Sequence, residues 1–245
     1  MIVSTMTANE VFEVMERDTE RLAAWASYRE KELMRELRKS RRETVAQSYD
    51  YHTDNADYVI ILRCNRKGYI SRLRFAFIQE TLEYVTIATQ GGRKGALSYS
   101  THLLRRYAER VLHDTTLPIR KILLKMTQND VTACLYADDD YYVSGSEMGI
   151  CLGKYDNQRT ILVYRTFVSI DMLKETQLAA WEKVSDFVKK VAELKKRYGL
   201  YSNQCQAALK QCPMDMHLSI DEAQSIYASF FDKNDKRENL QDDGS

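Results

Sequence analysis

The sequence predicts an α+β fold with antiparallel sheet, and three observations lead to this prediction. Amphipathic, helix-like segments lie at both ends of the chain, and runs rich in β-branched and aromatic residues lie between them. These strand-like runs follow one another instead of alternating with helices, which favours antiparallel sheet. Only nine glycines and two prolines interrupt the 245 residues. We therefore expect two strand meanders, flanked by two long amphipathic helices and several shorter helices.

The first predicted element is one long helix over residues 8–46. Thr7 and Glu10 have the spacing of a capping box at its start. Apolar residues recur at helical spacing and form a stripe that contains Leu22, Trp25 and Leu33. The basic run over residues 35–42 is interpreted as solvated helix surface.

Three antiparallel strands are predicted next, over residues 58–64, 69–79 and 82–89. In the second of them, large apolar residues alternate with arginines. Successive side chains of a strand point to opposite faces, so one face is predicted to be core and the other wet or ligand-facing. The core face would hold Leu73, Phe75 and Phe77, and the other face Arg72 and Arg74.

A loop over residues 90–95 and two helices over residues 100–113 and 118–127 separate this meander from a second one. The loop, Gln-Gly-Gly-Arg-Lys-Gly, lacks the terminal Lys-Ser/Thr of a phosphate-binding P-loop. The second meander is predicted from four strand-like runs with short turns between them. These runs cover residues 132–137, 141–144, 149–154 and 160–170.

The last part of the chain is predicted to be helical. A long helix over residues 171–198 ends before Gly199, which favours a left-handed C-cap. Its apolar stripe contains Trp181, Val184, Phe187 and Val191, and we expect it to pack against the stripe of the first helix. Two shorter helices are predicted over residues 203–211 and 219–231.

These elements suggest four segments along the chain. Residues 1–50 form an N-terminal long helix, and residues 51–170 form an α+β core. Residues 171–231 form a helical region that packs on this core, and residues 232–245 form a flexible tail.

Composition excludes several classes of protein. The formal net charge of +1 gives no global attraction to polyanions. The five cysteines form no CxxC pair, which favours a reducing compartment. With no signal-like start and no long apolar run, we expect a cytoplasmic protein that makes no membrane contact. No metal-ligand pattern or cofactor motif is present, so neither a metal nor a cofactor is expected.

The helix over residues 100–113 carries the candidate catalytic residues. At helical spacing His102, Arg106 and Arg110 share one face with Glu109 and His113. Imidazole can act as a general base near pH 7, and guanidinium groups can hold a phosphate. Arg165, on a strand that looks buried on both faces, is expected to need a partner. This partner is either structural, for example Glu109 or Asp171, or a substrate phosphate, and in the second case Arg165 completes the predicted site. The alternative is an exposed helix face with ion pairs.

A second candidate surface is basic and aromatic. Residues 57–125 contain thirteen lysines and arginines against five acids, with interleaved tyrosines. Such a pattern can follow a nucleic-acid backbone and stack bases, although it can equally be the basic side of a neutral protein. The residues predicted to bind nucleic acid are Arg63, Arg72, Arg74, Arg93 and Lys94.

The element order over residues 98–169, a helix with histidine and arginine followed by a four-stranded sheet, is similar to the plan of barnase- and RelE-like endoribonucleases. This resemblance implies RNA cleavage without a metal, with His102 as general acid and base and the three arginines as phosphate clamps. The first hypothesis is therefore an intracellular protein that acts on nucleic acid. The second is a non-catalytic protein that binds a protein partner, or a second copy of itself, through its long helices.

Overall fold

The computed structural model describes residues 1–66, 68, 70–90, 93–129, 133–137, 141–198 and 218–231. It confirms a mixed α+β fold. One sheet of nine strands, mostly antiparallel, has the order β1-β2-β3-β4-β5-β9-β8-β7-β6. The chain divides into two compact units, Met1–Asn129 with Asp156–Arg165, and Asp130–Tyr155 with Thr166–Ser245. No helix in the described part is long and apolar enough to cross a membrane.

Two helices replace the predicted single helix over residues 8–46. The first helices and strands of the chain are α1 (Ala8–Arg17), α2 (Thr19–Lys39), β1 (Thr44–His52), β2 (Asp57–Asn65) and β3 (Ile70–Ile78). The capping box of Thr7 and Glu10 is present at the start of α1. The prediction was wrong at Asp18, where the first helix ends, and again from Thr44, where alternating β-branched and aromatic residues form a strand.

Asp18 explains the break between α1 and α2. Its carboxylate is buried and accepts hydrogen bonds from Thr53 Oγ1, Asn55 Nδ2 and Tyr58 Oη at 2.7–2.8 Å. Burial alone would raise the pKa of Asp18, but these hydrogen bonds outweigh it and hold the pKa below its ordinary value. Asp18 thus receives three hydrogen bonds from β2 and from the turn before it. These hydrogen bonds fix the start of α2 over the sheet.

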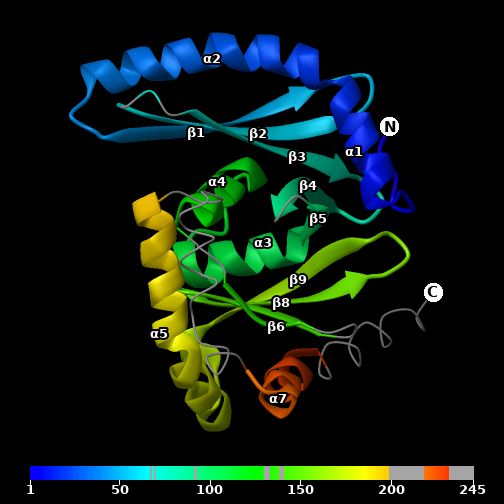
Figure 1. Ribbon diagram of the computed structural model, residues 1–245, viewed down its shortest axis with the longest axis vertical. Helices are drawn as coiled ribbons and strands as arrows, with labels where there is room; N and C mark the ends of the chain where they lie inside the picture. The colour runs from blue at the N-terminus through cyan, green and yellow to red at the C-terminus, as the bar shows by residue number, and fades with distance from the viewer. Residues whose placement is uncertain are drawn as a thin grey trace. The chain divides into compact units, whose positions relative to one another are not determined.

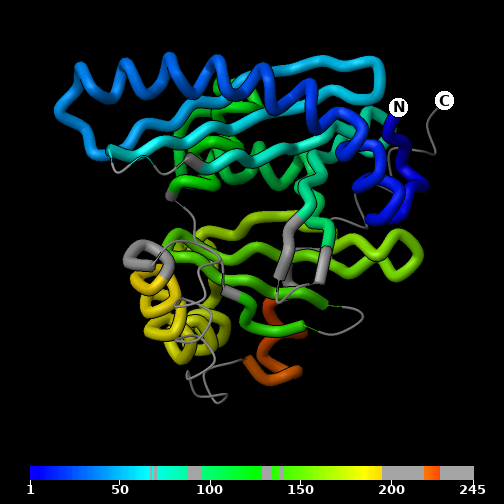
Figure 2. Tube along the Cα trace, turned by 45° about the horizontal axis from the view of Figure 1, so that its top comes forward, coloured from blue at the N-terminus to red at the C-terminus, as the bar shows by residue number. Residues whose placement is uncertain are grey.

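Helix α2 lies along β1, β2 and β3 on one face of the sheet (Figures 1 and 2). Its buried stripe of Leu22, Ala26, Leu33 and Leu37 joins Ile60 and Leu62 in one hydrophobic core. The opposite face of these strands carries α4 (Ile119–Asn129), which contacts β1 and packs on α3 (Thr101–Tyr107). The first unit is therefore a sheet covered on both faces.

Strand β3 has the predicted alternation. Phe75 is buried and Arg72 is exposed as predicted, but Leu73, Arg74 and Phe77 are all half-buried. The face that carries the arginines is not open, however. Ala76 and Ile78 on that face are fully buried, and α2 covers much of it.

Strands β4 (Glu83–Gln90) and β5 (Arg93–Ser100) form an antiparallel hairpin, so much of the predicted loop over residues 90–95 is strand. Strand β5 then pairs in parallel with β9 (Ile161–Ser169) over Ala96–Tyr99. This pair is an exception to the predicted antiparallel sheet. A parallel pair needs a long crossover, which here contains α3, α4 and three strands.

The second unit contains β6 (Ala133–Ala137), β7 (Tyr142–Ser146), β8 (Gly149–Asp156), α5 (Glu175–Tyr198) and α7 (Ile220–Phe231). A short 3₁₀ helix, η2 (Ile170–Met172), precedes α5. The stripe of α5 is buried with Leu135, Val143, Ile150 and Leu152 in this unit's own core. The predicted packing of this stripe on that of the first helix is therefore wrong, because each long helix covers its own strands. The predicted helix 203–211, Gly199, the turn at 138–140 and the tail 232–245 lie outside the described residues.

Candidate functional site

Arg72, predicted to bind nucleic acid, is held by a carboxylate of α2. Its Nε donates to Oε1 of Glu30, and its Nη2 donates to Oε2 at 2.9 Å. The Glu30 side chain is only 7% exposed, and this hydrogen bond raises the pKa of Arg72 above its ordinary value. A bidentate pair of this kind fixes both side chains and fastens α2 to β3.

Arg74 is fastened in the same way at the junction of α1 and α2. Its Nη1 donates to the backbone oxygen of Met15 at 3.1 Å and to Oγ1 of Thr19 at 3.0 Å. Its Nη2 lies 3.6 Å from a carboxylate oxygen of Glu16. Arg72 and Arg74 thus have a structural role, because both side chains fasten β3 to the helices that cover it.

The other three predicted nucleic-acid residues are divided between two places. Arg63 Nη2 donates to the backbone oxygen of Thr127 at 3.1 Å, near the C-terminal end of α4. Arg93 and Lys94 pair with β4 through their backbone, while their side chains lie outside the described residues. The three residues whose side chains are described, Arg63, Arg72 and Arg74, are thus each hydrogen-bonded within the fold.

A hydrogen bond joins the start of α3, which carries His102 and Arg106, to the backbone of Arg165 on β9. Ser100 caps α3 by accepting a hydrogen bond from the Leu103 amide at 3.1 Å, and its Oγ donates to the backbone oxygen of Arg165 at 2.9 Å. His102 follows two residues later and is exposed. Arg106 pairs with Glu109 at 2.9 Å, as expected for the exposed-helix alternative.

Two details of this region differ from the prediction. Arg165 is exposed, although the rest of β9 is buried, and the pairing of β9 with β5 ends one residue earlier, at Tyr164. The helix also changes to a π-helix, η1 (Ala108–Leu112). The wider π-turn alters the spacing, so the α-helical face predicted for Arg110 holds only as far as Tyr107.

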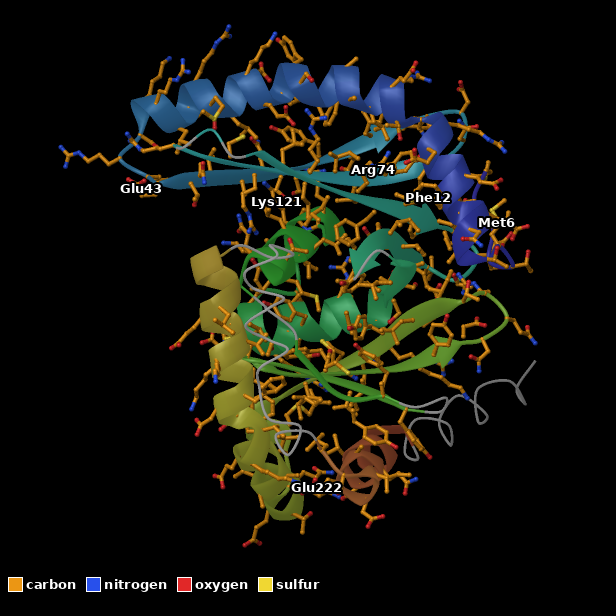
Figure 3. All side chains as sticks on the ribbon, viewed as in Figure 1. Met6, Phe12, Glu43, Arg74, Lys121 and Glu222 are labelled. Carbon is orange, nitrogen blue, oxygen red and sulfur yellow. The ribbon has the colours of Figure 1, made fainter. Side chains whose placement is uncertain are left out.

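The outward face of α2 carries a basic surface that includes part of the basic run predicted to be solvated helix surface. Lys31, Arg35, Arg38 and Lys39 are exposed and lie opposite the buried stripe, at spacings of three and four residues. Side chains project from the side of α2 that faces away from the sheet, and some of them end in nitrogen atoms (Figure 3). Within the described part of the chain, none of the four forms an ion pair.

The loop after α2 continues this surface. Arg66, on the β2–β3 turn, donates from Nε to the backbone oxygen of Arg42 at 2.8 Å and from Nη2 to that of Ser40. These hydrogen bonds hold the loop that exposes Arg41 and Arg42. We call Lys31, Arg35, Arg38, Lys39, Arg41 and Arg42 the basic ridge.

An aromatic side chain flanks the basic ridge. Tyr28 is 62% exposed on α2, one turn before Lys31 on the same side of the helix. The Arg29 guanidinium lies 5.7 Å from the Tyr28 ring centroid and 5.6 Å from that of Tyr49, within cation–π range. The surface therefore combines cations with one accessible aromatic ring.

No protein-family model, curated protein or solved structure matches this chain. Among the described residues, no group of three or more histidine, cysteine, aspartate or glutamate side chains could hold a metal ion. The signal for the basic ridge was present in the sequence. Between Lys31 and Arg42 six cations face only two acids, but their common outward side is evident only once the buried stripe of α2 is known.

Proposed function

We propose that this protein binds nucleic acid through the basic ridge, on α2 and the loop after it, mainly by contacts to the phosphate backbone. The observation that carries the proposal is the spacing of like charges. Lys31 and Arg35, and then Arg35 and Lys39, are four residues apart on the exposed side of one helix. Like-charge pairs at this spacing destabilise a helix by a few tenths of a kcal/mol each.

Helix electrostatics account for only part of this pattern. Arg38 and Lys39 lie in the last turn of α2, where cations interact favourably with the helix dipole. Lys31 and Arg35 lie further from the helix end and gain little from it. A bound polyanion would offset their repulsion and would release its own counterions, which favours binding.

The position of Tyr28 favours single-stranded nucleic acid. An exposed tyrosine beside a row of cations provides a platform for one base, and such stacking contributes about 1–3 kcal/mol per base. Bases inside a duplex are stacked on their neighbours at both faces, so the Tyr28 ring could stack only on the bases at a duplex end. Tyr28→Ala is therefore expected to weaken binding of single-stranded RNA more than binding of duplex DNA.

The proposal is tested by fluorescence anisotropy with a labelled single-stranded RNA. The ridge variant Lys31→Gln, Arg35→Gln, Arg38→Gln is compared with the control variant Lys154→Gln, Lys174→Gln, Lys190→Gln. All six lysines and arginines are exposed, and both variants lose the same charge. Loss of affinity in the ridge variant alone supports the proposal. Equal weakening would show a non-specific charge effect, and no RNA binding by the wild type would favour the protein-interaction hypothesis.

Metal-independent RNA cleavage is a second candidate function. The hydrogen bond from Ser100 to the backbone oxygen of Arg165 favours this candidate. His102 follows Ser100 by two residues, so the backbones of His102 and Arg165 lie near each other. In this candidate His102 would transfer the proton and Arg165 would hold the phosphate. The same RNA is incubated with wild type and with His102→Ala in the presence of a chelator. Cleavage by the wild type alone supports this candidate, and intact RNA in both samples refutes it.

A further inference from the structure

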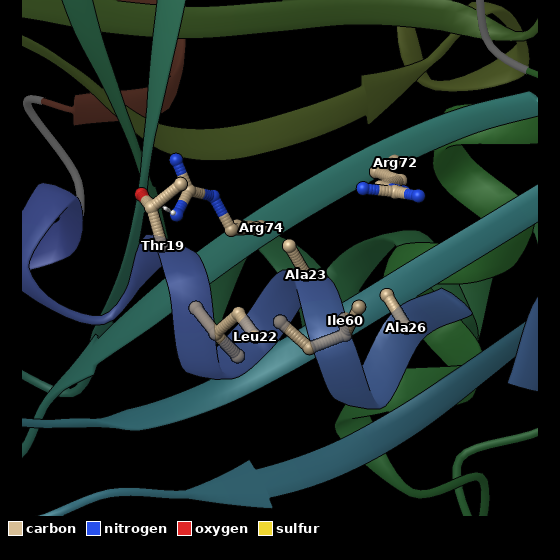
Figure 4. A pocket seen from close by; sticks show the side chains of 7 residues that line it. All are labelled: Thr19, Leu22, Ala23, Ala26, Ile60, Arg72 and Arg74. Atoms are coloured by element: carbon tan, nitrogen blue, oxygen red, sulfur yellow. Dashed lines mark hydrogen bonds between the residues drawn. The ribbon is translucent and has the colours of Figure 1, made fainter. Parts of the chain in front are cut away.

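A cavity of about 240 Å³ lies between α2 and strand β3 in the first unit. Its apolar lining comes from Leu22, Ala23 and Ala26 of α2 and from Ile60 of β2, and its polar lining from Thr19, Arg72 and Arg74. Figure 4 shows the two arginines at separate ends, with Arg74 beside Thr19 and Ala23 between them. The cavity is distinct from the basic ridge, which lies on the opposite side of α2.

The sequence of α2 explains why this space exists. Leu22 and Ala26 belong to the buried core, and the short side chains of Ala23 and Ala26 leave space between α2 and the arginines of β3. The guanidinium groups do not fill the space, because Glu30 holds Arg72, and Thr19 and the Met15 carbonyl hold Arg74. The result is an apolar floor with fixed cations at both ends.

Both guanidinium groups keep donors for a ligand. Arg72 uses Nε and Nη2 on Glu30, and no described residue accepts a hydrogen bond from its Nη1. Arg74 uses Nη1, and its Nε has no hydrogen-bond acceptor among the described residues. Because the protein already holds both side chains, an anion would bind without having to order them.

The local charge selects the ligand. Two guanidinium groups face two carboxylates: Glu30, which is buried, and Glu16, which is half-exposed and lies 3.6 Å from Arg74. Since these carboxylates already compensate the two cations, the remaining N–H donors suit an acceptor with one negative charge better than a phosphate dianion, which would add two charges. We propose that this cavity binds a small monocarboxylate with a short apolar chain.

The size of the cavity supports a short chain. Pockets that hold drug-sized ligands measure roughly 300–1,000 Å³, and this one is smaller. The carboxylate would lie against Arg72 or Arg74, and the chain would cover Ala23, Ala26 and Ile60. This inference goes beyond nucleic-acid binding and does not depend on it.

Hexanoate is the probe for this site, and the arginine Nε–H signals in ¹⁵N–¹H spectra are the measurement. Hexanoate is expected to shift the signals of Arg72 and Arg74 saturably. Methyl hexanoate, which lacks the charge, and inorganic phosphate are expected to leave them unchanged. Shifts that are equal for hexanoate and its ester, shifts with phosphate only, or no shift with hexanoate would each overturn the proposal.

A matched pair of variants locates the binding. Ala23→Leu fills the cavity, whereas Ala24→Leu adds the same atoms on the exposed side of the same helix. Ala23→Leu is expected to weaken hexanoate binding about tenfold or more, and Ala24→Leu to leave it unchanged. Equal binding by both variants would place hexanoate elsewhere and refute this site. If Ala23→Leu does not fold, the wild-type comparison of hexanoate with its ester still decides.

Discussion

The ion pair between Glu83 and Arg159 ties the β8–β9 turn to the start of β4. The two side chains are only 10% and 11% exposed. Both Nη1 and Nη2 of Arg159 donate to the same carboxylate oxygen of Glu83, at 3.2 and 3.3 Å. The buried Nε of Arg159 has no hydrogen-bond partner within the described residues, so Glu83 is the main partner of this guanidinium group.

Glu83→Ala is predicted to destabilise the protein strongly. Removing one partner of a buried ion pair costs about 3–5 kcal/mol, because the remaining charge is left without compensation. Asp156 Oδ2 lies 4.0 Å from Arg159 and supplies part of this compensation, so we expect a value near the low end, roughly 3 kcal/mol. At roughly 2–4 °C per kcal/mol for a chain of this size, the melting temperature should fall by about 6–12 °C.

Denaturant unfolding of a double-mutant cycle measures this pair. Arg159→Ala should also be destabilising, and the double variant should cost less than the sum of the single variants, because no buried charge is left unpaired. Glu13→Ala, an exposed glutamate on α1, is the control and should change stability by less than about 0.5 kcal/mol. A Glu83→Ala variant as stable as this control, or strictly additive effects, would refute the reasoning.

Three further predictions concern other parts of the fold. The pKa of Asp18 is lowered by folding, so its stabilisation is present above its unfolded pKa of about 3.9 and is lost as the pH falls through the folded value; the stability gap between wild type and Asp18→Asn should therefore shrink in acid denaturation series. Gly149→Ala would place a Cβ 2.2 Å from the Val168 carbonyl oxygen, whereas at Gly95 nothing lies within 4 Å; thermal melting should show a loss of about 1–3 kcal/mol or more for the first and little change for Gly95→Ala. Arg165→Ala should change stability by less than about 0.5 kcal/mol in the same assay, because the side chain is exposed; a large loss would show that Arg165 has a buried partner.

Local patterns in the sequence were sufficient for much of the secondary structure. The alternation of Arg72, Leu73 and Arg74 gave the correct faces of β3, and helix α4 is close to its predicted range. The break at Asp18 was missed because its hydrogen-bond partners, Thr53 to Tyr58, are distant in sequence. A capping or breaking role that depends on such partners has no local signature.

Strand pairing between residues distant in the sequence could not be predicted, for a similar reason. The parallel pair of β5 and β9 joins residues about sixty-five positions apart, and its register depends on everything folded between them. The partners of Arg72 and Arg74 likewise come from α2 and its junction with α1. Sequence alternation placed these arginines on one face correctly, but it could not show that a helix covers that face.

Nucleic-acid binding by the basic ridge is tested most directly by its salt dependence. For single strands, the logarithm of the affinity falls with the logarithm of salt concentration with a slope of about −0.7 per neutralised phosphate. Neutralising Lys31, Arg35 and Arg38 together should therefore make the slope shallower by about 2, while the control variant with Lys154, Lys174 and Lys190 neutralised keeps the wild-type slope. Equal slopes for the wild type and the ridge variant would contradict binding through α2.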